Sequence, residues 1–311
     1  MDIAISGSSG LIGRALASAL ARDGHRVVRL VRPATEDAGG DTVAWDPRNG
    51  TIDRPGLEGV DAIVNLAGAG VGAGRWNAER KRELFRSRVR GTQLLARTLP
   101  TLQAPPEVFV NGSAVGYYGH RGDRELTESD GPGSGYLAEV ATAWEEAAAP
   151  AREAGIRTVL LRSAHVLAPH GGFLPYLLMP FRFGLGARLG GGRQWFPWIT
   201  LEDEVDAIRF ALEERSVRGP VNAAAPEPVT NRDFTTTLAR VLRRPAPWWA
   251  PAPVLRALVG AERADQVLLS SAKVVPGTLL RSGFTFTDPQ LEPALRRLLG
   301  RVSEPVPSPV G

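Results

Sequence analysis

The sequence predicts an α/β fold of the Rossmann type: a doubly wound parallel sheet followed by a smaller, partly helical substrate lobe. Three observations support this prediction. An apolar run leads into a glycine-rich turn and an amphipathic segment within the first 22 residues, and apolar strand patterns then alternate with helical patterns up to about residue 165. After that point loop-rich stretches with interleaved aromatic residues take over. Alternating strands and helices are typical of parallel sheets covered by helices on both faces.

The first strand, the turn and the first helix form the most informative segment. Residues 3–6 are expected as a strand and residues 11–22 as a helix, and a second strand at 25–31 completes a βαβ unit. In the turn, Gly7 suits the tight bend, Gly10 the approach of the backbone to a pyrophosphate, and Gly13 close helix packing. An anion would rest on N–H groups where the helix begins. We therefore expect a dinucleotide at Gly7, Ser9, Gly10, Leu11, Ile12 and Gly13.

The remaining elements follow from the same periodicities. Further strands are expected at 42–45, 62–66, 108–112 and 158–162, and helices at 79–99, 136–154, 203–215, 231–242 and 291–299. From these we predict a nucleotide-binding domain over residues 1–165, to which the chain returns at about 196–226. The substrate lobe would comprise residues 166–195 and 227–300. The Pro- and Ser-rich tail, 301–311, is expected to be disordered.

Composition excludes several classes of protein. The net charge is only +4, and the basic residues are spread along the chain, so nucleic-acid binding is not expected. The chain has no cysteine, which excludes disulfides and thiolate metal sites, and its four histidines lack metal-ligand spacing. Without a long apolar run or a secretory leader, no membrane segment is expected and the cytoplasm is the default compartment.

Two positions suggest how a cofactor would be selected and held. Arg32 follows the second strand about 20 residues after the glycine turn, where an NAD site presents an acidic residue to the ribose. An arginine there fits the 2′-phosphate of NADP, although a plain surface arginine is the alternative. Leu66, Ala67 and Gly68 end the fourth strand with small residues, as a backbone packed against a ribose would need; an ordinary turn is equally compatible.

Candidate catalytic residues follow the fifth strand. Ser113 would place a hydroxyl near a nicotinamide, and Tyr117 and Tyr118 come shortly after it. A structural serine at the strand end is the alternative interpretation of Ser113.

These motifs resemble a known superfamily. Gly7-x-x-Gly10-x-x-Gly13, Asn65-Leu66-Ala67-Gly68, Ser113-Ala114-Val115-Gly116-Tyr117-Tyr118-Gly119 and Arg162 resemble the extended short-chain dehydrogenase/reductases, the NAD(P)-dependent epimerase/dehydratases. Gly74-Arg75-Trp76, Lys81, Ser87-Arg88, Trp144-Glu145 and Asn222-Ala223-Ala224-Ala225-Pro226 narrow the likeness to a branch called epimerase family proteins, which carries its own short C-terminal domain. The resemblance covers about residues 1–300.

The resemblance implies an NADP-binding site that includes Arg162, and a catalytic mechanism based on Tyr-x-x-x-Lys with an orienting serine. Tyr136 stands at the tyrosine position, but Val140 occupies the lysine position. An unassisted tyrosine near pKa 10 is a poor base at neutral pH. Lys81 is the more plausible replacement of the two lysines in the chain, and Tyr117 is the alternative source of a phenol.

Two functions from different classes remain open. The first is an NADP(H)-dependent oxidoreductase or epimerase acting on a small carbonyl or sugar-like, polar or phosphorylated substrate. That substrate would be received by Arg162, Arg188, Arg193, Gln194 and Trp195. The second is a non-catalytic NADP(H) sensor, which the missing lysine favours and the retained Ser113 and tyrosines oppose. A homodimer is a further option, because related short-chain enzymes commonly self-associate.

Overall fold

A doubly wound sheet organises the protein, as the sequence predicts. The computed structural model describes residues 1–33, 41–72 and 74–301, so the predicted tail lies outside the described residues except for residue 301. Across the sheet the strands run in the order β14 (Gly219–Ala223), β8 (Arg157–Ser163), β6 (Val108–Ala114), β5 (Ala62–Asn65), β1 (Asp2–Ser6), β2 (Arg26–Val31), β3 (Thr42–Asp46) and β4 (Thr51–Ile52). Neighbouring strands are parallel except for β3 and β4, which form an antiparallel edge.

The strand order reverses beside β1, and this reversal positions the site. The chain runs outward from β1 to β3 and then continues on the other side of β1 with β5, β6 and β8. Ser6 at the end of β1 is level with Leu30 of β2 and Asn65 of β5. In such sheets ligands bind beyond the carboxyl ends of the strands where the order reverses.

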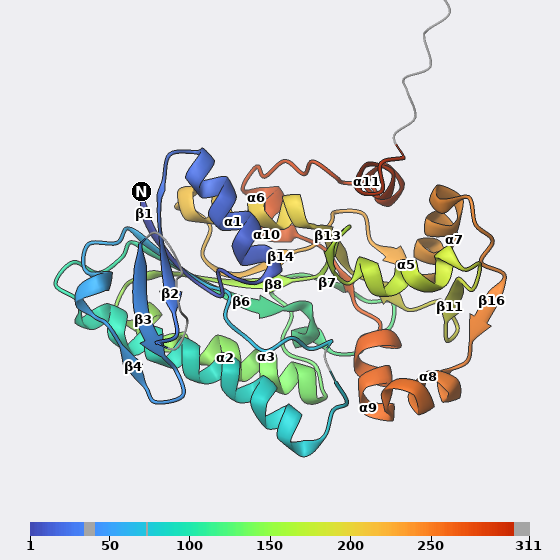
Figure 1. Cartoon of the computed structure of the whole chain (residues 1–311), viewed down its shortest axis with the longest axis horizontal. Helices are drawn as coiled ribbons and strands as arrows, with labels where there is room; N and C mark the ends of the chain where they lie inside the picture. Colours follow the sequence, from blue (N-terminus) through green and yellow to red (C-terminus); the bar gives the residue numbers. More distant parts are fainter. Residues whose placement is uncertain (34–40, 73, 302–311) are drawn as a thin grey trace, which may run out of the picture.

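Helices cover both faces of the sheet (Figure 1). One face carries α1 (Leu11–Arg22), α6 (Leu201–Glu213) and α10 (Gly277–Arg281), and the other carries α2 (Ala78–Thr98), α3 (Tyr136–Glu146) and α4 (Ala149–Glu153). Side chains alternate along each strand, so Ile3 and Ile5 join the core on the α1 side and Ala4 joins the core on the other. Both faces are apolar, as a buried parallel sheet requires.

The predicted helix over 136–154 is wrong in one respect, because it is two helices. α3 ends at Glu146 and α4 begins at Ala149, with Pro150 in its first turn. Proline has no N–H to continue the hydrogen-bond ladder of a preceding helix, and it fits the first turn of a new one.

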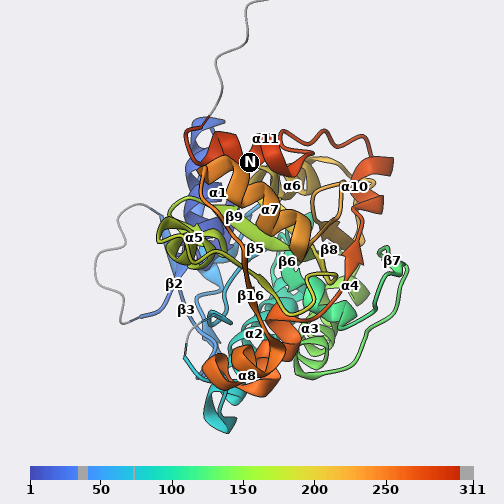
Figure 2. The same cartoon turned by 90° about the vertical axis from the view of Figure 1, so that its right-hand side faces the viewer.

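The remaining elements gather at one end of the sheet around a second core (Figure 2). The helices that contribute to this core are α5 (Leu174–Arg182), α7 (Asn231–Leu242) and α11 (Leu291–Leu298). Two further helices, α8 (Ala252–Val259) and α9 (Ala261–Arg263), lie at the same end of the molecule. The short strands at this end are β9 (His165–Ala168), β10 (Gly171–Gly172), β11 (Ala187–Leu189), β12 (Trp195–Phe196), β13 (Trp198–Thr200), β15 (Val229–Thr230) and β16 (Trp248–Ala250), while β7 (Glu125–Leu126) pairs with β17 (Lys273–Val274). Short 3₁₀ turns lie at η1 (Pro55–Leu57), η2 (Leu99–Thr101) and η3 (Val115–Tyr118), and a π-helical turn lies at η4 (Ala264–Leu268).

This second core supports the predicted division of the chain, which stays a prediction. Leu174 and Phe181 of α5 pack with Phe234 of α7 and Leu291 of α11, apart from the two cores of the sheet. The segments that the sequence suggested as plain loops contain β11 and β16, which pair in parallel. Among the described residues, no helix is both long and apolar enough to cross a membrane.

Candidate functional site

The glycine turn has the geometry that a dinucleotide requires. Gly7 adopts a positive φ of 70°, and a Cβ on it would lie 2.7 Å from the backbone of Leu66. A Cβ on Gly13 would lie 2.2 Å from the carbonyl oxygen of Gly7. The start of α1 can therefore lie against the turn, and the turn against the end of β5, only because these positions are glycine.

The start of α1 is open to an anion. Gly10 precedes the helix with an extended backbone, no side chain caps the first turn, and no acidic residue lies within it. The first N–H groups of a helix have no partner inside it, so those of Leu11, Ile12 and Gly13 are donors that a pyrophosphate can use. Ser9 lies in the exposed turn just before them.

The other predicted cofactor residues lie at the same edge of the sheet. Arg32 is exposed directly after β2, two residues beyond the position level with Ser6. The loop after β5 is held to the end of β1, because Ser6 accepts the N–H of Leu66 through its carbonyl at 3.2 Å and that of Ala67 through its hydroxyl at 3.3 Å. Gly68 follows and is exposed. The predicted cofactor residues, except Arg162, therefore lie at the edge of the sheet beside β1.

Ser113 is not placed as a catalytic residue would be. Its side chain is 4% exposed, and its hydroxyl donates to Glu145 at 2.6 Å. Glu145 is also bound by both arms of Arg162, at 2.8 and 2.9 Å. The serine therefore belongs to a buried network that joins β6, α3 and β8, which favours the structural interpretation of Ser113; its catalytic role stays a prediction.

Arg162 is likewise committed to this network. Its side chain is 2% exposed. Burial alone would lower its pKa, but the hydrogen bonds and charge of Glu145 outweigh burial, so the pKa of Arg162 is raised. The guanidinium also donates to the Tyr118 hydroxyl at 2.9 Å and lies 3.6 Å over the ring of Tyr117. Arg162 is therefore engaged by Glu145 and the two tyrosines, and Tyr117 is half-buried against it. The predicted roles of both residues at the cofactor and the substrate stay predictions.

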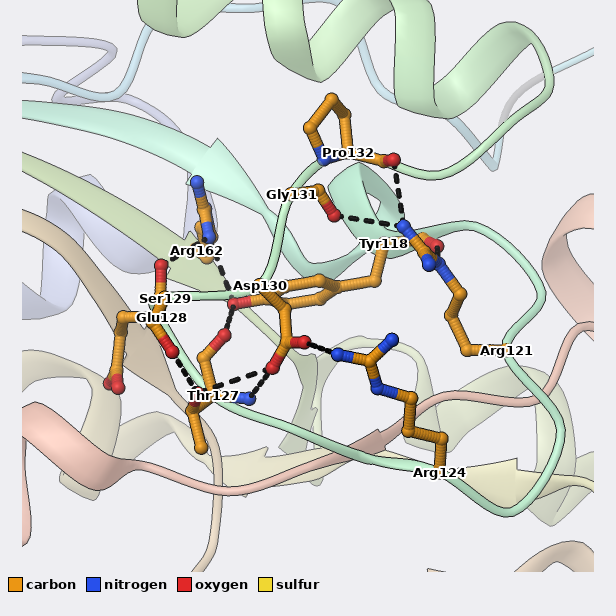
Figure 3. Close-up of polar contacts among 10 residues, drawn as sticks. All are labelled: Tyr118, Arg121, Arg124, Thr127, Glu128, Ser129, Asp130, Gly131, Pro132 and Arg162. Atoms are coloured by element: carbon orange, nitrogen blue, oxygen red, sulfur yellow. Dashed lines mark hydrogen bonds and ion pairs between the residues drawn. The ribbon is translucent and has the colours of Figure 1, made fainter.

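The loop after η3 closes over this network (Figure 3). Figure 3 shows the Tyr118 hydroxyl beside Arg162 and the carbonyl of Thr127, from which it lies 3.0 Å. Asp130 accepts the N–H of Thr127 at 2.8 Å, and Arg121 donates to the carbonyls of residues 131 and 132. Burial raises the pKa of Tyr118 to about 12, so this phenol stays protonated and serves the structure.

Tyr136 lies beside Lys81, but not as a catalytic pair would. The phenol donates to the backbone carbonyl of Lys81 at 2.5 Å. The Lys81 ammonium lies 4.4 Å from the centre of the tyrosine ring and is bound by Glu262 at 2.8 Å. Burial raises the pKa of Tyr136 above its ordinary value of 10, and the charge of Arg88 opposes that rise. Lys81 therefore contacts the ring face, and Arg88 is the cation whose field stabilises the phenolate most.

Arg88 is a functional candidate that the sequence did not single out on chemical grounds. Its guanidinium lies 5.1 Å over the Trp144 ring and donates to the Leu84 carbonyl at 3.1 Å, and it makes no ion pair within the described residues. Burial lowers its pKa to about 10. A Cβ on Gly68 would lie 3.3 Å from it. This cation thus lies between the predicted cofactor loop and Tyr136.

Tyr136 opens into a cavity of about 880 Å³ between the sheet and the second core. Of the four predicted catalytic residues, Tyr136 lines this cavity, whereas Ser113, Tyr117 and Lys81 do not. Nor do Arg188, Arg193, Gln194 and Trp195 line it. Gln194 and Trp195 are instead bound internally, Gln194 to the carbonyls of Leu189 and Leu268 and Trp195 to Asp123. The arginine-rich substrate site predicted from the sequence does not form here.

Two further titratable groups lie at or behind this cavity. His165 lines it, and its Nδ1 lies 2.7 Å from the Pro197 carbonyl, which can only accept; Nδ1 therefore carries the proton and Nε2 is an acceptor. Burial lowers the pKa of His165, so the ring is neutral. Behind the cavity wall, Ser163 donates to the buried carboxyl of Glu204, whose pKa burial raises to about 7.

Comparison with known proteins agrees with this geometry. Residues 3–224 match the NAD dependent epimerase/dehydratase family, and residues 250–298 match a domain of unknown function, DUF1731. The chain belongs to the NAD dependent epimerase/dehydratase family. An epimerase family protein of Mycobacterium leprae is 42% identical over 302 residues, which cover 97% of each chain.

Two solved structures are similar along nearly the whole chain. The human epimerase family protein SDR39U1 (isoform 2), solved with NADPH, has a TM-score of 0.87 at 33% identity, covering 97% of this chain and 100% of that one. A nucleoside-diphosphate sugar epimerase of Corynebacterium glutamicum has a TM-score of 0.79 at 34% identity, covering 96% of this chain and 58% of that one.

The two positions at which the sequence resemblance implied a catalytic tyrosine and lysine lie on α3. Tyr136 is present, but Val140 stands one helical turn later and lines the cavity in place of a lysine. Ala114, not Ser113, presents the end of β6 to the cavity. Strand alternation explains the latter, because neighbouring side chains on β6 point to opposite sides. The alternation of side chains along β6 is the sequence signal that could have indicated that Ala114, not Ser113, faces the cavity. No group of residues suited to a metal ion occurs within the described residues.

Proposed function

We propose that the chain binds NADPH and is an oxidoreductase or epimerase of the short-chain dehydrogenase/reductase type, acting on a small carbonyl compound or its alcohol. The observation that carries this proposal is the meeting of three features at one edge of the sheet. These are the glycine turn, the uncapped start of α1 and the cavity that Tyr136 lines. The NADPH bound to the similar human protein supports the choice of cofactor.

In the proposed site the backbone holds the pyrophosphate and Arg32 the 2′-phosphate. The N–H groups of Leu11, Ile12 and Gly13 are the donors for the pyrophosphate, and the loop from Leu66 packs the ribose. Arg32 lies at the end of β2, where a phosphate on the adenine ribose would be paired by a bidentate contact.

Tyr136 is the proposed proton carrier. Bound NADPH supplies a hydride to the carbonyl carbon of the substrate. Because its pKa is raised by burial, Tyr136 is protonated at neutral pH and can give its proton to the carbonyl oxygen, which leaves an alcohol. Arg88 stabilises the phenolate that remains, in the role that the absent lysine would have. His165 offers Nε2 as an acceptor that can orient a hydroxyl in the same cavity.

The alternative is a non-catalytic NADPH sensor. Val140 at the lysine position and the burial of Ser113 favour it. The solvent-facing cavity with Tyr136 at its wall favours catalysis, because a sensor needs no proton donor beside the nicotinamide.

A turnover assay with matched variants tests this proposal. NADPH oxidation would be followed by nicotinamide absorbance across apolar and polar aldehydes, ketones and nucleotide sugars. Tyr136→Phe should lower kcat by about 10² to 10⁴, the usual contribution of a general acid. Tyr117→Phe is the control, because Tyr117 lies under Arg162 away from the cavity. Equal losses in both variants, or NADPH binding without turnover of any compound, would refute the catalytic assignment.

A further inference from the structure

We propose that the substrate of this cavity has an apolar body and carries at most one anionic group. This inference rests on the proposed function, since it names the class of carbonyl compound that the site receives. It differs from the sugar-like or phosphorylated substrate that the sequence suggested.

The walls of the cavity are apolar on both sides of the crevice. From the Rossmann side come Leu137 and Val140 of α3, and from the side of the second core come Leu177 and Phe181 of α5 and Leu268 of η4. At about 880 Å³ the cavity is near the upper end of the range for small-molecule sites, roughly 300 to 1,000 Å³. An apolar body of considerable length can therefore be buried there beside the nicotinamide.

At the exposed edge of the cavity, large apolar side chains lie among three polar ones, His120, Ser134 and Asp265. Tyr176, Leu185 and Leu258 all line the cavity and are 69, 60 and 68% exposed. Single exposed apolar side chains are ordinary, but three around one opening form a surface that favours an apolar ligand.

The charges available to a ligand are few. Arg88, Arg263 and Asp265 are the charged side chains that line the cavity within the described part of the chain. Arg263 donates to the carbonyls of Gly72 and Gly74, and Asp265 is paired with Arg256. Of these three charged side chains, Arg88 alone has neither an ion pair nor a hydrogen-bond partner outside its own helix in the described structure; it donates to the carbonyl of Leu84.

A nucleoside diphosphate would be poorly matched to these groups. Burying its two phosphates needs several donors or cations, and an uncompensated buried charge is costly. One guanidinium, deep in the cavity beside Gly68, can pair with one carboxylate or phosphate, or with the cofactor itself. The geometry therefore points to a hydrophobic ketone, aldehyde or alcohol, with Arg88 as the only anchor for an acidic group.

A displacement assay on the full chain tests this proposal. The protein, saturated with NADP⁺ so that no reduction occurs, would be titrated with the uncharged apolar fluorophore aminoanthracene. The apolar ketone decanone should displace the fluorophore, and UDP-glucose should not. Failure of fluorophore binding, or displacement by UDP-glucose but not by decanone, would overturn the proposal.

A pair of variants on one helix locates the binding. Leu258→Glu places a charge at the mouth and should weaken fluorophore binding on the order of tenfold, because a charge replaces an apolar side chain that the bound fluorophore would cover. Val254→Glu is the matched control, because Val254 is also on α8, is 47% exposed and does not line the cavity. Both sites are exposed, so folding should survive. Equal affinities in the two variants would place the fluorophore elsewhere and overturn the proposal.

A cofactor titration on the same samples distinguishes a failure of the apolar-substrate proposal from a failure of the proposed function. If NADPH binds but decanone does not, the apolar substrate is wrong and the proposed function stands. If neither nucleotide binds while the fluorophore does, the proposed function fails and the apolar cavity remains.

Discussion

At the scale of single residues, the burial of Glu204 makes the stability of the folded protein depend on pH. Its side chain is fully buried on α6, Ser163 binds one carboxyl oxygen, and the other oxygen has no hydrogen-bond partner in the described structure. Burial raises the pKa of Glu204 from 4.5 to about 7, against the opposing effect of the Ser163 hydrogen bond.

Stability should therefore fall with rising pH in a defined window. The unfolded chain releases the Glu204 proton near pH 4.5, whereas the folded protein keeps it until about pH 7. The folded state binds more protons between these values, so the free energy of unfolding decreases as pH rises through them, by on the order of 3 kcal/mol. Glu204→Gln should remove this step in urea unfolding measured across the window. An unchanged slope in the variant would contradict the assignment.

The residue scale also shows where sequence reasoning reaches its limit. It identified Ser113, Arg162 and Tyr136 as polar residues at the carboxyl ends of strands and the start of a helix, and all three lie there. It could not tell which side each faces, because that depends on partners distant in sequence. Glu145, 32 positions from Ser113, turns the serine inward. Glu262, 181 positions from Lys81, binds the ammonium of that lysine, which lies over the ring of Tyr136.

At the scale of elements, the turn between β1 and α1 makes the sharpest prediction. Gly10 has φ −75° and ψ 175°, which any residue can adopt, and a Cβ there meets only the Gly7 carbonyl at 3.2 Å. Gly10→Ala should therefore fold with nearly unchanged Tm, yet weaken NADPH binding at least tenfold, because the methyl group occupies the approach of the pyrophosphate.

The control for this variant is Gly131→Ala, where a Cβ meets nothing within 4 Å and φ is not positive. It should leave both Tm and NADPH affinity unchanged. If Gly10→Ala bound NADPH as tightly as Gly131→Ala, the turn would be architectural only.

Elements with strong local signals were predicted well. Residues 11–22 and 231–242 are helical with the expected bounds, because the apolar periodicity is clear in both segments. The second helix also begins with a capping box, formed by Thr230 and Asp233. The split between α3 and α4 depends on Pro150, a local signal that the sequence interpretation overlooked. The pairing of β11 with β16 joins Arg188 to Trp249, two positions far apart in the chain, and no local pattern indicates it.

At the scale of the whole molecule, the site is made by joining two cores. The sheet supplies the glycine turn, Arg32 and Tyr136, and the segments around the second core supply α5 and α8, which form much of the cavity wall (Figures 1 and 2). The sequence predicted the sheet and the existence of a lobe. It did not predict that the lobe presents apolar side chains to the cavity, because which side chains of α5 and α8 face it depends on segments that are far apart in the sequence.

We propose above all that the edge of the sheet beside β1 is an NADPH site in which Arg32 binds the 2′-phosphate. The most direct test is to titrate the wild type and Arg32→Asp with NADPH and NADH, following nicotinamide fluorescence. A charge-assisted contact to the 2′-phosphate is worth about 1.5 to 3 kcal/mol, so the wild type should prefer NADPH by roughly ten- to a hundredfold. The variant should lose or reverse that preference. An NADPH to NADH affinity ratio that is the same in both proteins would contradict the role of Arg32, and binding of neither nucleotide by the wild type would contradict the site itself.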